Sequence, residues 1–111
     1  MNLAIIIYSN DPEVVWNAFR LGNTALGYDK TVSIFLLGKG VECLSLDSIK
    51  YNIREQLDYY EEYGGKLVGC DLCCELREDE MPFLREDLNC EMGSMQNLYD
   101  ITMEADKVIT F

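Results

Sequence analysis

The chain has 111 residues, of which 49% are hydrophobic, so it can bury a core and is not an intrinsically disordered chain. Its 20 acidic and 9 basic residues give a formal net charge of -11, which disfavours binding to nucleic acid and to anionic membranes. We attribute this acidity mainly to solubility. The alternative is an acidic face for a basic partner, with Glu75 to Glu91 as the best candidate.

The first half of the chain predicts two strands and one helix. Leu3 to Tyr8 is a continuous apolar run, typical of a central parallel strand. It is too short for the core of a signal peptide or for a membrane span, so we expect a cytoplasmic protein without a membrane partner. Pro12 suits the first turn of a helix that ends at Gly27, and Thr31 to Leu37 predicts the second strand, followed by a turn at Gly38-Lys39-Gly40.

The second half continues the alternation of helices and strands. A helix that Asp47 or Ser48 caps and Gly64-Gly65 ends is followed by a strand over Lys66 to Gly69 and by a helix over about Asp71 to Glu78. Glu80 to Glu91 is expected to be a loop, with a short strand near Cys90 as an option. The chain then continues with a helix capped by Ser94 and a strand over Lys107 to Phe111. The inward face of the helix that ends at Gly64-Gly65 is expected to carry Ile49, Ile53, Leu57 and Tyr60. The inward face of the helix that Ser94 caps is expected to carry Met95, Leu98, Ile101 or Thr102, and Ala105. This order predicts an α/β fold, a single three-layer domain with a mostly parallel sheet flanked by helices.

Five cysteines and the absence of histidine limit the chemistry. An odd number of cysteines in a reducing compartment argues against a disulfide framework, so some thiols should be free, metal-bound or catalytic. Without histidine, Cys–His and Ser–His catalysis is excluded. The cysteines are Cys43, Cys70, Cys73, Cys74 and Cys90.

Cys70 is the first candidate site residue because it follows a predicted strand and begins a predicted helix. Ligands of α/β proteins bind at the carboxyl ends of strands, and a helix start stabilises a thiolate. Cys70 and Cys73 have the C-x-x-C spacing of redox motifs, although Asp71 between them opposes thiolate formation. The structural alternative is that these cysteines fill core volume, which for Cys73 is as good an interpretation as a functional role.

The loop Gly38-Lys39-Gly40 follows the neighbouring strand. Its simplest interpretation is a tight turn, since the glycine-rich nucleotide motifs are absent. The functional interpretation places its N–H groups and the Lys39 ammonium near Cys70, because both follow parallel strands at one edge of the sheet, and predicts that Lys39 lowers the pKa of that thiol.

A thiolate cage for zinc or an iron–sulfur cluster is a further alternative. It would use Cys70, Cys73 and Cys90 with Cys43 or Cys74. The chain has only one C-x-x-C pair and no histidine, so we expect neither a metal nor another cofactor.

Four segments are informative when their order and spacing are taken together: Leu3 to Ser9 with Ala18-Phe19, Val32 to Val41, Leu67 to Cys70 with Leu76-Arg77, and Asp106 to Phe111. In this combination they are similar to the DsrE/DsrF-like family, which includes the sulfur-relay proteins of the DsrEFH and TusBCD complexes. The resemblance covers essentially the whole chain and implies one DsrE/DsrF-like domain over residues 1–111. After Arg77 the chain departs from the many relatives that continue with glycine, since it has Glu78-Asp79-Glu80.

The resemblance implies a function for Cys70. It is the residue that falls on the position of the cysteine that carries a persulfide in the sulfur-relay members, whereas Cys74 and Cys90 cannot be assigned in this way. We therefore predict a sulfur carrier or sulfurtransferase in which Cys70 receives sulfur from a donor protein and passes it to an acceptor thiol. Cys73 resolves the persulfide, and the supporting residues are Gly38, Lys39, Gly40 and Arg77. The alternative is a redox-sensing or binding module without turnover of its own.

Self-association is the last expectation. Trp16, Leu21, Tyr59 and Tyr63 lie outside the inward stripes of their helices, and exposed apolar surface of this kind favours association. The resemblance implies a homotrimer or a homohexamer.

Overall fold

The computed structural model describes residues 1–111 and contains a five-stranded sheet in which every pair of neighbouring strands is parallel. The strand order is β4-β3-β2-β1-β5. The strands are β1 (Asn2–Ile7), β2 (Thr31–Leu36), β3 (Lys66–Cys70), β4 (Glu91–Gly93) and β5 (Lys107–Thr110). The mostly parallel sheet predicted from the sequence is therefore confirmed, as is the optional short strand after Cys90.

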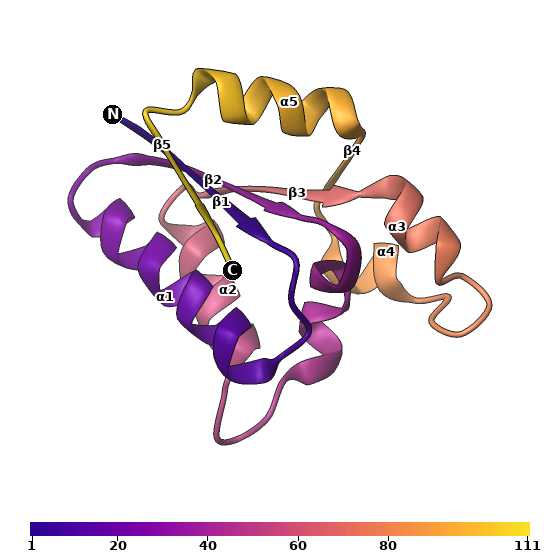
Figure 1. The fold of residues 1–111 in the computed structure, drawn as a ribbon. Coiled ribbons are helices and arrows are strands. Elements are labelled where there is room, and N and C mark those ends of the chain that lie inside the picture. The colour runs from indigo at the N-terminus through magenta and orange to yellow at the C-terminus, as the bar shows by residue number, and fades with distance from the viewer.

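Helices cover both faces of the sheet and form three layers (Figure 1). They are α1 (Pro12–Gly27), the 3-10 helix η1 (Gly38–Leu46), α2 (Ile53–Glu62), α3 (Asp71–Leu76), α4 (Leu84–Leu88) and α5 (Met95–Glu104). In Figure 1, α1 and α2 lie below the sheet and α5 lies above it, while α3 projects beyond the end of β3. None of these helices has both the length and the apolar character needed to cross a bilayer.

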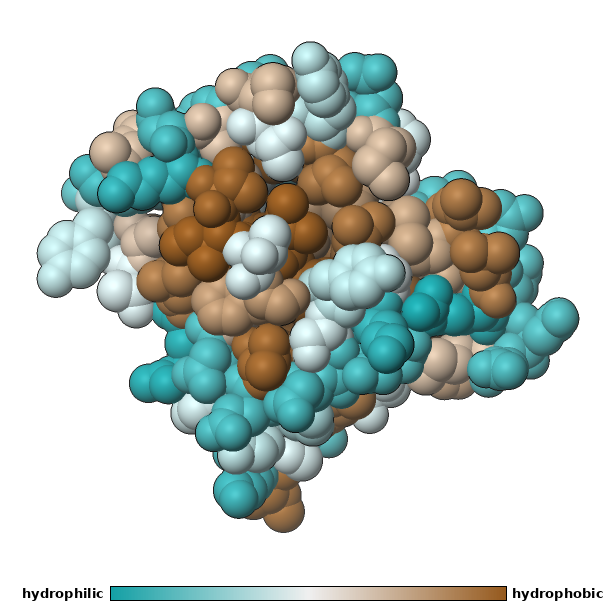
Figure 2. Space-filling view, viewed as in Figure 1, coloured by the Kyte–Doolittle hydropathy of each residue, from teal (hydrophilic) through white to brown (hydrophobic).

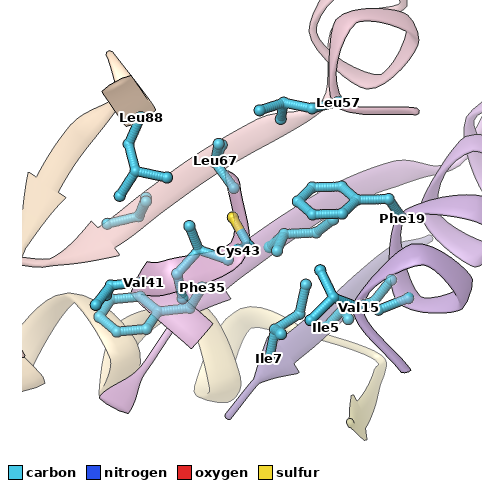
Figure 3. Close-up of a cluster of buried hydrophobic side chains, with 14 of the residues drawn as sticks. Ile5, Ile7, Val15, Phe19, Phe35, Val41, Cys43, Leu57, Leu67 and Leu88 are labelled. Carbon is cyan, nitrogen blue, oxygen red and sulfur yellow. The ribbon is translucent and has the colours of Figure 1, made fainter. Parts of the chain in front are cut away.

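The main core lies between the sheet and the α1–α2 layer (Figure 3). Val15 and Phe19 of α1 are buried against Ile5 and Ile7 of β1, because apolar residues four apart share one face of a helix and alternate residues share one face of a strand. Tyr60 of α2 is also fully buried, and its hydroxyl lies 2.6 Å from the carbonyl oxygen of Lys66. That hydrogen bond ties α2 to the start of β3.

Four details differ from the sequence-based expectation. The second helix begins at Ile53, where Asn52 caps it by accepting a hydrogen bond from the N–H of Glu55, so Ile49 is fully exposed rather than inward-facing. Residues 38–46 form η1 instead of a simple turn, and α4 lies within the predicted loop. Met95, at the first position of α5, is 66% exposed, whereas Leu98 is buried as predicted.

A close approach of backbone fixes the loop after β2. A Cβ atom at Gly40 would overlap the carbonyl oxygen of Ile7, which is backbone and cannot move aside cheaply. The Ile7 carbonyl also accepts a hydrogen bond of 2.9 Å from the N–H of Leu37. The loop that holds Gly38 is thus packed directly on the end of β1.

We expect Gly40→Ala to lower the free energy of unfolding by about 1–3 kcal/mol, because the added methyl group overpacks this contact. The matched control is Gly27→Ala at the end of α1, where nothing lies within 4 Å of the new Cβ atom and no loss is expected. Urea denaturation of both variants measures the difference. Equal stability of the two variants would contradict the proposed close packing.

Candidate functional site

The candidate site lies at the carboxyl end of the sheet, where β3 passes directly into α3. Cys70 is both the last residue of β3 and the N-cap of α3. Its Sγ atom accepts a hydrogen bond of 3.3 Å from the backbone N–H of Cys73. The predicted position of Cys70, at a strand end and a helix start, is therefore confirmed.

Two sulfur atoms meet at this junction. The Sγ atoms of Cys70 and Cys73 are 2.6 Å apart, which is longer than an S–S bond and close enough for one to form after a small side-chain movement. Cys70 is 7% exposed and Cys73 is half-buried, and both are free thiols. The backbone N–H of Gly38 donates a hydrogen bond of 3.2 Å to Cys73 Sγ. The loop after β2 therefore contacts the thiol pair through Cys73.

Burial governs the ionisation of Cys70. Burial is the largest cause, and together with the hydrogen bond between the two side chains of Cys70 and Cys73 it raises the pKa of the Cys70 thiol to about 11. The Cys73 N–H acts in the opposite direction but does not compensate. The helix start therefore has the expected lowering effect, but burial outweighs it because a buried thiolate loses the hydration that stabilises its charge, and Lys39 is not among the main causes of the shift.

The supporting residues occupy three different places. Arg77 makes an ion pair with Glu42 of η1 at 2.8 Å and donates a hydrogen bond of 3.1 Å to the carbonyl oxygen of Cys73, so it joins α3 to η1. Gly40 packs on β1, as described above. Lys39 is exposed and takes part in none of the ion pairs, which involve Arg77 and Arg85. Glu42 was missed by sequence analysis because nothing in its local sequence indicates a partner 35 residues away.

A pocket of about 440 Å³ opens beside Cys70, between α3 and the segment that joins β4 to α5. Met92 and Met95 contribute its apolar side and Asn97 contributes an amide. Two depressions of about 480 and 460 Å³ border α1 and α2, but no cysteine lines them. The Cys70 pocket is thus the one that offers a thiol to a ligand, and the contribution of β4 and α5 was not predicted.

Cys90 lies apart from this pair. The Cys90 Sγ atom would be 3.5 Å from a Cβ atom on Gly69, and because neighbouring residues of a strand face opposite sides, Cys90 lies across β3 from the Cys70 side chain. Burial raises the pKa of Cys43 to about 12 and that of Cys90 to about 11. Burial also raises the pKa of Cys74.

The alternative of a thiolate cage requires these cysteines to converge. No group of three or more cysteine, aspartate or glutamate side chains is arranged to hold a metal ion. The structure therefore does not assemble the cage considered from the sequence.

The raised pKa makes a prediction for the alkylation of Cys70, in which the thiolate attacks the carbon of iodoacetamide and iodide leaves. At pH 7 roughly one Cys70 in ten thousand is ionised, and we expect the rate to rise about tenfold per pH unit until it levels off near pH 11. Peptide mass spectrometry across a pH series measures this profile at each cysteine.

Two variants test the causes of the raised pKa of Cys70. Cys73→Ser should shift the profile to lower pH, because the Cys73 thiol is one cause of the raised pKa. Lys39→Met should leave it unchanged, since the main causes of the shift are burial and Cys73. A wild-type profile that levels off at or below the ordinary thiol value of 9.0 would show that Cys70 is not desolvated in this way.

Comparisons with known proteins identify the family of this chain. A model of the DsrE/DsrF-like family matches residues 1–111, and no curated protein matches. The solved structure of a conserved protein of unknown function from Bacteroides thetaiotaomicron has a TM-score of 0.78, at 15% sequence identity, over 99% of this chain and 94% of that chain. That likeness shows a shared fold, and the family match suggests a sulfur-relay-related role. The chain therefore belongs to the DsrE/DsrF-like family, as its sequence predicted.

Proposed function

We propose that this protein carries sulfur as a persulfide on Cys70 and passes it to an acceptor thiol. The observation that carries the proposal is the position of Cys70: its sulfur lies at the carboxyl end of a parallel sheet, beside a pocket and 2.6 Å from a second thiol. Membership of a family with sulfur-relay proteins supports it. The donor and the acceptor are then proteins that bind at the carboxyl end of the sheet, beside Cys70.

Sulfur uptake is an exchange at the outer sulfur of a donor persulfide. The Cys70 sulfur attacks that atom, a new S–S bond forms on Cys70, and the S–S bond of the donor breaks. The proton of Cys70 goes to the sulfur that leaves the donor, so a thiol and a persulfide are exchanged without net oxidation. Delivery repeats these steps, with the acceptor thiol attacking the outer sulfur on Cys70.

Cys73 can end the cycle in a second way. If its sulfur attacks the inner sulfur of the Cys70 persulfide, a Cys70–Cys73 disulfide forms and hydrogen sulfide leaves, carrying the proton of Cys73. The 2.6 Å separation of the two sulfur atoms favours this route. Gly38 and Arg77 are positioning residues in this scheme, because each donates a hydrogen bond to Cys73, and Gly40 positions the loop of Gly38.

The second candidate function is a redox sensor, and the same short distance between the sulfur atoms favours it. In a sensor, a disulfide oxidant takes up the electron pair of the two thiols, is itself reduced to two thiols, and leaves Cys70 bonded to Cys73. No sulfur atom is gained. The protein that a sulfur carrier forms and the protein that a sensor forms therefore differ in mass.

We predict that Cys70→Ser abolishes the one-sulfur mass gain that the wild-type protein shows after incubation with a low-molecular-weight persulfide. The gain in the wild type should map to Cys70, and Cys73→Ser should retain it, because it loses the thiol that releases the sulfur. Cys90→Ser is the matched control and should behave as the wild type, since Cys90 lies on the other side of β3. Mass spectrometry of intact protein and of its peptides provides both readings.

Two outcomes would contradict sulfur transfer. Undiminished sulfur gain by Cys70→Ser would place the carrier elsewhere. A wild-type protein that only forms the Cys70–Cys73 disulfide, with Cys73→Ser gaining no sulfur either, would favour the sensor.

We also propose a homotrimer or homohexamer. Tyr59 and Tyr63 are exposed, whereas Trp16 and Leu21 are half-buried. Hydrophobic residues also gather on the face below α5 (Figure 2). On β5, at the edge of the sheet, Val108 and Ile109 are 44% and 36% exposed. Apolar surface of this extent favours association.

Light scattering across a dilution series in moderate salt tests the assembly. We expect a mass of three or six chains, because moderate salt screens the net charge of -11 that opposes association. A mass of 12.7 kDa at every concentration would contradict the proposal.

A further inference from the structure

The charges around the Cys70 pocket point to the kind of thiol that enters it. Asp71 and Glu75 line the pocket, and no lysine or arginine does. The Glu75 carboxylate is exposed and has no hydrogen bond or ion pair, so its charge is uncompensated. Two carboxylates at the mouth of a reactive thiol repel anions and attract cations.

The arginines of this region offset only part of that charge. Arg77 is turned toward Glu42 at 2.8 Å and is 22% exposed. Arg85 pairs with Asp71 at 2.8 Å and reaches Glu78 at 3.9 Å. One cation is thus shared between two carboxylates at the rim, and Glu75 is left without one. Glu78-Asp79-Glu80 continues the acidic surface beyond α3.

Apolar side chains border the same mouth. Leu72 of α3 is 60% exposed and Met95 of α5 is 66% exposed, and both line the pocket. In Figure 2 hydrophobic and hydrophilic residues lie side by side over the region of α3. A small sulfur compound would leave such side chains in water, whereas a polypeptide segment would cover them.

We propose, on the basis of the sulfur-carrier function above, that the pocket takes the cysteine of a partner polypeptide that carries apolar and positively charged residues beside that cysteine. Glu75 is then a specificity-determining residue. Anionic sulfur donors and acceptors are disfavoured because they approach an uncompensated carboxylate next to the reacting sulfur.

The test uses two cysteine peptides of equal length, one flanked by lysine and one by glutamate, each activated as a mixed disulfide with thionitrobenzoate. Cys70 attacks the peptide sulfur, the peptide becomes disulfide-bonded to Cys70, and thionitrobenzoate leaves and is followed by its absorbance. Cys73→Ser protein is used throughout so that the product is not resolved, and mass spectrometry verifies its attachment to Cys70.

We expect the lysine peptide to react faster by on the order of tenfold at low salt, with the ratio falling as salt is added. Adding Glu75→Gln should reduce this ratio by at least about threefold. Adding Glu62→Gln, the same change on exposed α2, is the control for net charge and should leave the ratio nearly unchanged.

Three results would overturn the proposal. The first is equal rates for the two peptides, and the second is a rate ratio that Glu75→Gln and Glu62→Gln reduce equally. The third is that cystamine, a small cationic disulfide, reacts as fast as the lysine peptide after each rate is corrected for the rate of the same compound with a free thiol. Because the assay needs no persulfide, it is independent of the sulfur-uptake experiment. Peptide selectivity without sulfur uptake would show that the pocket has this preference although the protein is not a sulfur carrier.

Discussion

Parallel pairing of β2 with β3 is the constraint on which the site depends. In this register Leu36 is opposite Gly69, so the segments that follow β2 and β3 leave the sheet at the same level. The Gly38 loop after β2 therefore meets the first turn of α3. The Gly38 N–H reaches the Cys73 sulfur from a loop that also packs on β1, where Gly40 allows the backbones to touch. If β2 and β3 were antiparallel, the loop after β2 and the thiols after β3 would lie at opposite ends of the sheet.

Burial gives the thiol pair its chemical character. Cys70 keeps its proton at neutral pH because the surrounding protein does not solvate a thiolate, and this slows reaction with oxidants and alkylating agents. Exchange at Cys70 then requires the proton to pass to a partner sulfur as the S–S bonds change. A partner that brings a proton acceptor into the pocket beside its sulfur electrophile would therefore speed the reaction of this thiol.

The acid-rich segment after Cys70 uses its arginines for internal contacts. Arg77 fastens α3 to η1 through Glu42, and Arg85 fastens α4 to the start of α3 through Asp71. The Arg77–Glu42 pair is half-buried and the Arg85–Asp71 pair is exposed, and exposed ion pairs contribute little to stability, typically about 0–1 kcal/mol. Their larger effect is on the surface potential, because the remaining carboxylates, Glu75 among them, face solvent beside the pocket.

The amino-acid sequence by itself determined the order of the strands and of the other helices apart from η1 and α4, the parallel sheet and the place of Cys70, because apolar periodicity and capping residues are local signals. It also determined the acidity of the segment after Cys70. Only the tertiary structure decided the ionisation of Cys70 and the contact of Gly38 with Cys73, since desolvation and pairing depend on segments brought together by the sheet. The Glu42–Arg77 ion pair is of the same kind, because it joins residues whose separation in sequence carries no periodic signal.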